Sequence, residues 1–448
     1  MNINDVRQSV YSSEHKGFSS EKIDGCISEA FQKLNSRTLD FKSLVIFNYR
    51  QKSRCLARFA SLSPEDVIQK AVSKKIVRIL KIFSANRNEV AYRLFRTLDS
   101  LYQLDDFTIF RFDFKKCFYS LSPSFICEKW IFPFIDDPTL LYVLKKYCSD
   151  VNHCWPGIAL SNAMVELAGE RFDDAFVSKL AEYSIVFYQR YVDDGILILR
   201  KSLASSQIEK LLSEVIYEVF SKNSQGHVTR VNHVSFHGQG SSKFQSLSFA
   251  DLIANPKKRA TFTYLGYSFH ICLGNDEKIL LKFGVNPQSN KTQKFVDQLA
   301  HALQKNKGNE LAIIETLKLF SLRLVYQKKI YSKQVWLEKG FLASYPELYS
   351  EFSKLDPFTE RFLKDALYQG IKKAGISCPS SIKLKKGGMS FSLYSSAYKK
   401  KSIVFNNVIG VHTKDLKRAV VNCGFPISKY QNYNNLVNDL LSGCGIKF

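Results

Sequence analysis

Two adjacent carboxylates stand in the segment Tyr191-Val192-Asp193-Asp194-Gly195, between the apolar, strand-forming residues 183–188 and 196–199. This pattern predicts a β-hairpin whose tight turn is Asp193-Asp194-Gly195. Two acids at a hairpin tip repel one another, and a divalent cation is the usual counter-charge that relieves the repulsion. Taken alone the pattern is weak, because Asp-Asp-Gly is also a common turn without function.

A third acid, Asp113, follows the apolar residues 108–110 and precedes a polar and aromatic turn. A strand that ends in a carboxylate can place it beside the carboxylates of a neighbouring strand. Two or three carboxylates from separate strands can hold a pair of Mg²⁺ ions, which activate an attacking 3′-hydroxyl and stabilise a leaving pyrophosphate. Asp113, Asp193 and Asp194 are therefore the candidate catalytic and metal-binding residues.

Four segments, in the expected order, resemble the palm motifs of reverse transcriptases. They are Asp113 with Phe118 and Leu121, Gly157 with Ser161 four residues later, residues 190–194, and the primer-grip-like residues 263–269. The first and third motifs lie 80 residues apart (193 − 113), a normal gap for that palm. The resemblance covers roughly residues 85–270. It implies an α+β right-hand polymerase with fingers, a palm built on an antiparallel sheet, and a helical thumb, followed here by a basic C-terminal region.

The second motif resembles that of one particular group of reverse transcriptases. Residues 157–167 look like those of bacterial abortive-infection and unclassified-group reverse transcriptases, which act in antiphage defence. Where the family usually has Pro-Gln-Gly, this chain has Trp155-Pro156-Gly157, so the glutamine that touches the incoming nucleotide is missing. This departure bears on templated fidelity and leaves the metal chemistry untouched.

The resemblance also implies roles for individual residues near the metals. The backbone carbonyl of Phe114 would complete the shell of one ion. The ring of Phe118 would pack under the sugar and exclude a 2′-hydroxyl, which selects deoxynucleotides; the alternative is that Phe118 is an ordinary core aromatic. Lys243 would protonate the departing pyrophosphate.

Further residues are assigned to the substrates. The resemblance places Gly157 and Ser161 in the floor under the nucleotide and template. It places Tyr191 in the nucleotide site, and Leu265 and Gly266 in the primer grip. Arg87 and Arg93 are candidates for triphosphate contact, because a guanidinium can hold phosphate oxygens in a bidentate manner. In the fingers, Ser63 followed by Pro64 predicts the start of a helix that runs to about residue 83.

The charge of the chain indicates a polyanionic partner. Its 448 residues carry a formal charge of +23, and nucleic acid is the default partner for such an excess. Residues 374–448 hold eleven Lys or Arg against two Asp, a net of +9 (11 − 2). The lysines near Phe391, Tyr394 and Tyr398 are the candidate RNA-binding residues: Lys383, Lys385, Lys386, Lys399, Lys400 and Lys401. The alternative is a basic terminal domain whose aromatics are core residues.

Four regions are expected along the chain: an N-terminal and fingers region (1–106), a palm (107–274), a helical thumb (275–373) and a basic C-terminal RNA-binding region (374–448). Helical periodicity at 290–304 and 311–326 supports the thumb. We expect a cytoplasmic protein with no membrane span, because no apolar stretch is long enough to cross a bilayer and no secretory signal is apparent. The ten scattered cysteines, without a Cys-x-x-Cys pair, fit a reducing compartment.

These observations predict an RNA-directed DNA polymerase, a nucleotidyltransferase, that uses two Mg²⁺ ions, with Mn²⁺ as an alternative. Its partners would be a noncoding RNA template, dNTPs and a DNA product, and a partner protein or a homo-oligomer stays open. Two alternatives remain: a reverse transcriptase of a mobile retroelement, and a non-catalytic RNA-binding scaffold derived from a polymerase. The intact acids argue against the scaffold, which has no use for a costly cluster of like charges.

Overall fold

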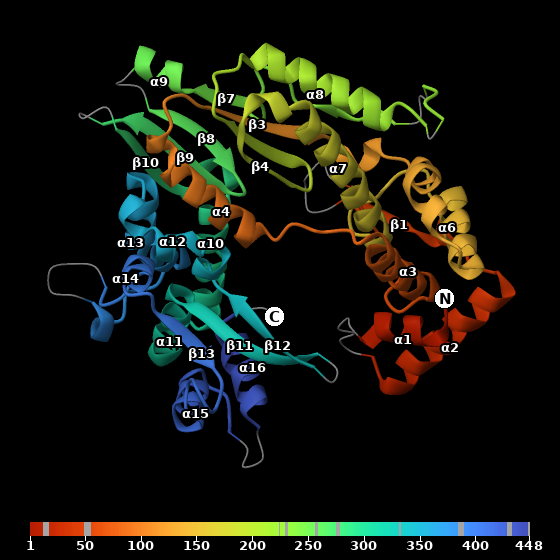
Figure 1. The fold of residues 1–448 in the computed structure, drawn as a ribbon. Coiled ribbons are helices and arrows are strands. Elements are labelled where there is room, and N and C mark those ends of the chain that lie inside the picture. Colours follow the sequence, from red (N-terminus) through yellow and green to blue (C-terminus); the bar gives the residue numbers. More distant parts are fainter. Residues whose placement is uncertain are drawn as a thin grey trace. The chain divides into compact units, whose positions relative to one another are not determined.

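The structure is a computed structural model and consists of two compact units, residues 1–255 and 256–448, which are treated separately below (Figure 1). The described residues are 1–11, 18–48, 55–223, 225–228, 232–255, 259–274, 278–330, 333–383, 389–427 and 432–446. Both units mix helices with mainly antiparallel sheets, so the α+β class expected from the sequence is confirmed. Among the helices of these residues, none combines the length and apolar character that a membrane span requires.

The first unit contains nine α-helices and seven strands within its described residues. The helices are α1 (Ile3–Tyr11), α2 (Ser20–Ser36), α3 (Pro64–Leu80), α4 (Arg87–Asp99), α5 (Pro123–Ile126), α6 (Pro138–Asp150), α7 (Ala159–Lys179), α8 (Ser205–Phe220) and α9 (Phe249–Ala254). The strands are β1 (Val45–Asn48), β2 (Cys55–Arg58), β3 (Thr108–Lys115), β4 (Ile185–Tyr191), β5 (Asp194–Leu199), β6 (Ser235–Phe236) and β7 (Gln245–Ser248).

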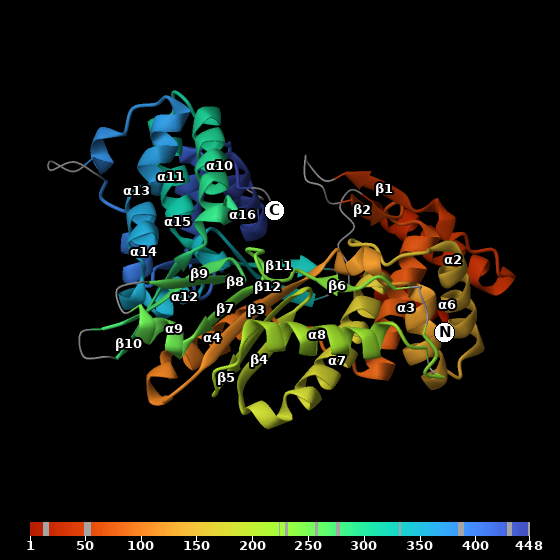
Figure 2. The same ribbon diagram turned by 90° about the horizontal axis from the view of Figure 1, so that it is seen from above.

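The main sheet of this unit is built around β3. Its order is β4-β5-β3, and β3 pairs on its other side with β7 and then with β6, always antiparallel. The ring of Phe112 on β3 makes edge contacts with Phe172 and Phe176 of α7. Phe172 in turn stacks on Phe220 of α8, so α7 and α8 cover one face of the sheet (Figure 2). This aromatic core fixes the strand ends on which the acids stand.

The hairpin formed by β4 and β5 corrects the predicted turn. Tyr191 pairs with Asp194, so the turn consists of Val192 and Asp193, while Asp194 and Gly195 belong to β5. Gly195 is therefore not a turn residue. It lies opposite Phe112, whose ring would collide with a Cβ at this position. Packing against an aromatic neighbour, rather than turn geometry, explains this glycine.

Two predicted helices can be compared directly with the structure. The helix predicted after Ser63 is confirmed: the Ser63 hydroxyl accepts from the Asp66 amide, and α3 begins at Pro64 but ends at Leu80. The helix predicted over 311–326 is wrong at its end, because α11 stops at Ser321 and a strand begins at Arg323. The cause is a change of period, since the buried Leu324 and Tyr326 alternate along one face of a strand.

The second unit contains seven α-helices and six strands within its described residues. The helices are α10 (Lys291–Lys305), α11 (Glu310–Ser321), α12 (Glu347–Ser350), α13 (Pro357–Ala374), α14 (Leu393–Tyr398), α15 (Thr413–Asn422) and α16 (Tyr433–Gly443). The strands are β8 (Ala260–Tyr264), β9 (Tyr267–Leu273), β10 (Ile279–Val285), β11 (Arg323–Ile330), β12 (Lys333–Lys339) and β13 (Ser402–Phe405).

Two three-stranded sheets organise this unit. One is the antiparallel meander β10-β9-β8, and the other has the order β12-β11-β13, in which β13 is parallel to β11. The inner face of the second sheet carries Leu324, Tyr326 and Phe405, which pack against α11, α15 and α16 in one buried cluster (Figure 1). The described C-terminal segments 402–427 and 432–446 thus contribute to a core shared with the β11 strand. The hairpin of residues 260–273, which the sequence places with the palm, belongs to this second unit.

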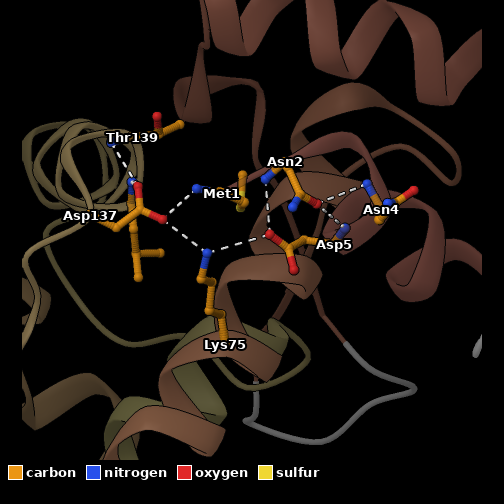
Figure 3. A network of polar contacts seen from close by, with 8 residues as sticks. Met1, Asn2, Asn4, Asp5, Lys75, Asp137 and Thr139 are labelled. Atoms are coloured by element: carbon orange, nitrogen blue, oxygen red, sulfur yellow. Dashed lines mark hydrogen bonds and ion pairs between the residues drawn. The ribbon is translucent and has the colours of Figure 1, made fainter.

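A polar network joins α1, α3 and the start of α6 within the first unit (Figure 3). The Met1 amine and the Lys75 ammonium both contact one oxygen of Asp137, with Lys75 at 2.9 Å. Lys75 also lies 3.4 Å from Asp5 of α1. Burial favours a higher pKa for Asp137, but the hydrogen bonds from the Met1 amine and from Lys75 outweigh it and hold the pKa well below its usual range.

We expect this network to make the stability of the first unit sensitive to acid. Because the pKa of Asp137 is lower in the folded than in the unfolded chain, its contribution is present above about pH 4 and is lost as the pH falls below that value. Asp137→Asn, which can still cap α6, should lower stability at pH 7 by no more than about 1 kcal/mol and should flatten the acid dependence. Urea unfolding at pH 7 and pH 3 measures both effects, and the exposed Asp174→Asn is the control. An unchanged acid dependence in Asp137→Asn would contradict the assignment.

Candidate active site

The structure brings the three predicted acids together at one end of the main sheet. Asp113, at the end of β3, is the direct cross-strand partner of Asp194, the first residue of β5. Asp193 occupies the turn beside them, and its carbonyl accepts a hydrogen bond of 2.9 Å from the amide of Phe114. Asp113 is only 6% exposed, whereas Asp193 and Asp194 are half-buried. Strand pairing therefore creates a carboxylate cluster from residues 80 positions apart.

Basic side chains lie against two of these carboxylates. The Lys243 ammonium is 2.6 Å from Oδ1 of Asp113, and Nε2 of His237 is 3.4 Å from the same oxygen. Arg111 of β3 donates to both oxygens of Asp194, over 2.9 and 3.2 Å. Lys243, which the sequence resemblance assigns to pyrophosphate, thus reaches the cluster from the loop before β7.

The pKa of Asp194 reflects the opposing charges around the cluster. Burial raises the pKa of this carboxyl to about 6; Arg111 opposes the rise, while Asp113 and Asp193 add to it. The two neighbouring acids thus disfavour a third negative charge, even though Arg111 contacts it. Additional positive charge at this end of the sheet would stabilise the fully ionised cluster.

The donor set matches a hard divalent cation in type, because Mg²⁺ prefers carboxylate and carbonyl oxygens. Within the described residues, however, no group of three or more His, Cys, Asp or Glu side chains is arranged to hold a metal ion. Lys243 and Arg111 supply the counter-charge for Asp113 and Asp194 in this structure. The cluster therefore fits a cation in the type and charge of its donors, while Asp113 and Asp194 contact the side-chain cations Lys243 and Arg111.

Arg190 binds the backbone of the Val192–Asp193 turn, a role that was not predicted from the sequence. Its side chain is 4% exposed, its Nη1 donates to the Val192 carbonyl over 2.7 Å, and its Nε lies 3.0 Å from Asp173. Glu166 lies 3.5 Å from the same guanidinium. Val192 has a φ of +58°, a costly conformation for a β-branched residue. Arg190 and its two acids therefore hold a strained turn in place.

A sequence signal for this network exists on α7. Glu166, Gly169 and Asp173 are spaced by three and four residues and so share one face of the helix. A Cβ on Gly169 would collide with the Arg190 guanidinium, so this glycine provides the space for it. Two acids that flank a glycine on one face of a helix are compatible with a buried cation, but nothing in the sequence names Arg190 as that cation.

The predicted nucleotide-floor residues, Gly157 before α7 and Ser161 in its first turn, both have structural roles. Gly157 has a φ of +101°, and a Cβ there would lie 2.6 Å from the Ala57 carbonyl oxygen of β2. Ser161 is fully buried, accepts from the Trp155 amide over 3.0 Å and bonds to the Tyr147 hydroxyl over 2.8 Å. Gly157 therefore allows a close backbone approach, and Ser161 shapes the loop from inside.

The remaining predicted residues of the first unit lie nearer the surface. Phe118 is half-buried in the 3-10 turn Cys117–Ser120, five residues after Asp113. Tyr191 is half-buried at the end of β4. Arg87 opens α4 and is half-buried, and Arg93 is exposed in the middle of the same helix.

The other predicted residues belong to the second unit. Leu265 and Gly266 form the two-residue turn between β8 and β9, with φ values of +49° and +83°. Lys383 and the three consecutive lysines 399–401 are exposed, whereas Lys385 and Lys386 lie outside the described residues. The rings of Tyr394 and Tyr398 contact Phe352, with centroids 4.8 and 5.3 Å away. Tyr398 is nevertheless 65% exposed and can offer a ring face to a ligand.

No protein-family model matches this chain, and no curated protein matches it at a significant level. The function is therefore inferred from the geometry of the carboxylate cluster and from the motif resemblance.

Proposed function

We propose that the protein is an RNA-directed DNA polymerase of right-hand architecture, with the carboxylate cluster of the first unit as its catalytic centre. One observation carries the proposal: Asp113 and Asp194 are paired across adjacent antiparallel strands, with Asp193 on the turn beside them. Carboxylates brought together from neighbouring strands in this way could hold the pair of divalent ions that phosphoryl transfer uses.

Each residue in and around the cluster would have a separate role in the reaction. Asp113, Asp193, Asp194 and the carbonyl of Phe114 would hold Mg²⁺, which supplies Lewis-acid stabilisation of the attacking and leaving oxygens. The Lys243 ammonium, 2.6 Å from Asp113, can give a proton to the departing pyrophosphate. Arg111 orients the Asp194 carboxylate through two hydrogen bonds. Arg190 keeps the turn, and with it Asp193, in position.

The wider role follows from charge and resemblance. A formal charge of +23 favours a bound polyanion, and we propose that this partner is a noncoding RNA that serves as template. Antiphage defence in a bacterial cytoplasm is the proposed setting, supported by the likeness of residues 157–167 to abortive-infection reverse transcriptases.

A second candidate function is favoured by the ion pairs of the cluster. Lys243 on Asp113 and Arg111 on Asp194 already neutralise two of the three acids. A non-catalytic RNA-binding scaffold derived from a polymerase could retain the acids in this internally paired form.

Purified protein distinguishes the two functions. The assay supplies an RNA template with an annealed primer, labelled dNTPs and Mg²⁺, and in parallel Mn²⁺ or a chelator. The polymerase should extend the primer with either ion and should not extend it with the chelator. RNA binding without extension under any metal condition would establish the scaffold instead. Sequencing the nucleic acid that co-purifies would identify the template.

Phe118 provides a test of sugar selection. If its half-buried ring packs under the sugar, Phe118→Ala should remove the clash with a 2′-hydroxyl and lower the preference for dNTPs over rNTPs roughly tenfold or more. The measurement is the ratio of kcat/KM for dNTP and rNTP incorporation. Phe118→Tyr preserves the bulk and should preserve the ratio. An unchanged ratio in Phe118→Ala would assign this ring to the core.

A further inference from the structure

A pocket in the second unit has a lining rich in carboxamides. It has a volume of about 410 Å³, within the ~300–1,000 Å³ range of small-molecule sites. Within the part of the chain that the structure describes, the lining residues have polar but uncharged side chains, apart from Phe405, and are Gln327, Gln334, Phe405, Asn406, Asn407, Asn432, Tyr433 and Asn434. Burial raises the pKa of Tyr433 to about 12, so this hydroxyl also stays neutral.

The sheet topology explains why a pocket forms here. β13 ends at Phe405, opposite Tyr326, whereas β11 continues to Ile330. Beyond Tyr326 the β11 strand therefore lacks a β13 partner. The chain after β13 and the start of α16 border this open edge, and their asparagines line it.

Some of the amides have structural partners and others do not. Asn406 donates to the Gln327 side chain over 3.1 Å, and Asn432 caps α16 by accepting from the Asn435 amide over 2.9 Å. Within the described residues, the side-chain amides of Gln334, Asn407 and Asn434 have no hydrogen-bond partner. Three donor–acceptor pairs are thus available to a ligand on a framework held by the others.

An exposed tryptophan is paired in the sheet with one of the lining residues. Trp336 is the cross-strand partner of Gln327, and paired residues of a ladder lie on the same face of the sheet. This face is opposite to the one that packs on α11, α15 and α16, and Trp336 is 44% exposed. Trp336 thus lies on the same face of the sheet as Gln327, and its exposed ring is free of that core to stack on a flat ligand.

These features define the chemistry of the ligand. None of the described lining residues carries the cation that a phosphate site would need, and an apolar ligand would leave the amides unsatisfied. Carboxamides present a donor and an acceptor side by side, which is how Asn and Gln read the edge of a base. The strong positive charge of the chain favours a base that belongs to a polyanion. The exposed lysines 399–401 immediately precede β13, whose other end reaches the pocket.

We propose that this pocket and Trp336 together bind an unpaired base of single-stranded RNA, with the amides on the base edge and the indole on its face. The site goes beyond the proposed polymerase function, because recognition of an unpaired base needs neither a metal nor a nucleotide triphosphate. It gives the second unit a base-reading role in addition to attraction for phosphates.

The test compares two fluorescent octamers, oligoadenylate RNA and the same backbone with abasic positions, on the full-length protein by anisotropy. No divalent ion or dNTP is added. The abasic strand should bind roughly tenfold more weakly, because stacking on one aromatic is worth about that factor. Trp336→Ala should weaken only the oligoadenylate by a similar factor, Trp336→Phe should largely retain binding, and Asn407→Ala with Asn434→Ala should also weaken it.

Two controls separate base reading from charge and from folding. Tyr368→Ala removes an aromatic that is 57% exposed on α13 and should leave affinity unchanged. Changing lysines 399–401 to glutamine should reduce the slope of log affinity against log salt by up to about 2, at about 0.7 per phosphate, whereas Trp336→Ala should leave the slope as it is. Circular dichroism checks the fold of each variant.

Equal affinity for the intact and abasic strands, or a Trp336→Ala protein that binds like Tyr368→Ala, would overturn the proposal. Displacement of the RNA by a neutral oligosaccharide would likewise overturn it and assign the pocket to carbohydrate. The comparison contains neither divalent ion nor dNTP, so its outcome does not depend on primer extension. Failure of base reading is thereby distinguished from failure of the polymerase function.

Discussion

Asp193→Ala is expected to abolish deoxynucleotide incorporation and to leave a folded protein. The carboxylate lies on a half-buried turn, and the backbone carbonyl of Asp193, which accepts a hydrogen bond from the Phe114 amide, is unchanged by the substitution. Loss of the carboxylate would remove a metal ligand and with it several kcal/mol of transition-state stabilisation. We therefore expect kcat/KM for primer extension to fall by at least about 10³-fold. Steady-state extension with Mg²⁺ measures the loss.

The control for this experiment is Asp105→Asn, a change at an exposed acid in the loop before β3. It alters the charge of the same unit by the same amount and should leave extension unchanged. Urea unfolding of both variants checks that the fold is intact. Extension at the native rate by Asp193→Ala would remove the cluster from the mechanism.

Arg190→Met is expected to cause a large loss of stability in the first unit. The methionine nearly matches the length of the arginine but leaves Glu166 and Asp173 without their shared counter-charge in a buried setting. It also removes the hydrogen bond to the carbonyl of the strained Val192. Breaking one partner of a buried ion pair costs about 3–5 kcal/mol, and we expect a loss of unfolding free energy in that range.

A matched change and a compensating change sharpen this test. Arg171→Met removes an arginine of α7 that is 41% exposed and 3.7 Å from Asp174, and it should cost no more than about 1 kcal/mol. Adding Glu166→Gln and Asp173→Asn to Arg190→Met should recover part of the stability, because no buried charge is then left unpaired. Urea unfolding measures these three variants beside the native protein. Equal losses for Arg190→Met and Arg171→Met would show that the network does not support the turn.

Local sequence determined the elements that carry the acids. Apolar residues before Asp113 predicted a strand that leads to this acid, and the apolar residues on both sides of Asp193 and Asp194 predicted a hairpin; β3 and the β4–β5 hairpin are present. The cap at Ser63 likewise predicted the start of α3. These features depend on neighbours in the chain, so periodicity and capping chemistry are sufficient to recognise them.

The turn of the hairpin illustrates where local patterns stop being sufficient. Asp-Asp-Gly reads as a turn, yet the turn is Val192–Asp193, because Gly195 is required opposite the Phe112 ring and Arg190 holds the strained Val192 from below. Phe112 and the partners of Arg190 come from distant parts of the chain. Their packing energy exceeds the local preference of a glycine for a turn position.

Local sequence also identified the acids, whereas long-range pairing decided which residues surround them. The residue types and spacing of Asp113, Asp193 and Asp194 were sufficient to single them out, because motif resemblance needs only sequence. Strand register decided that Asp113 lies opposite Asp194 and that Arg111 reaches Asp194, and the loop before β7 brings Lys243 to Asp113. The amide pocket beside Trp336 arose in the same way, from the point at which β13 ends along β11, and that point is set by long-range pairing that no local pattern records.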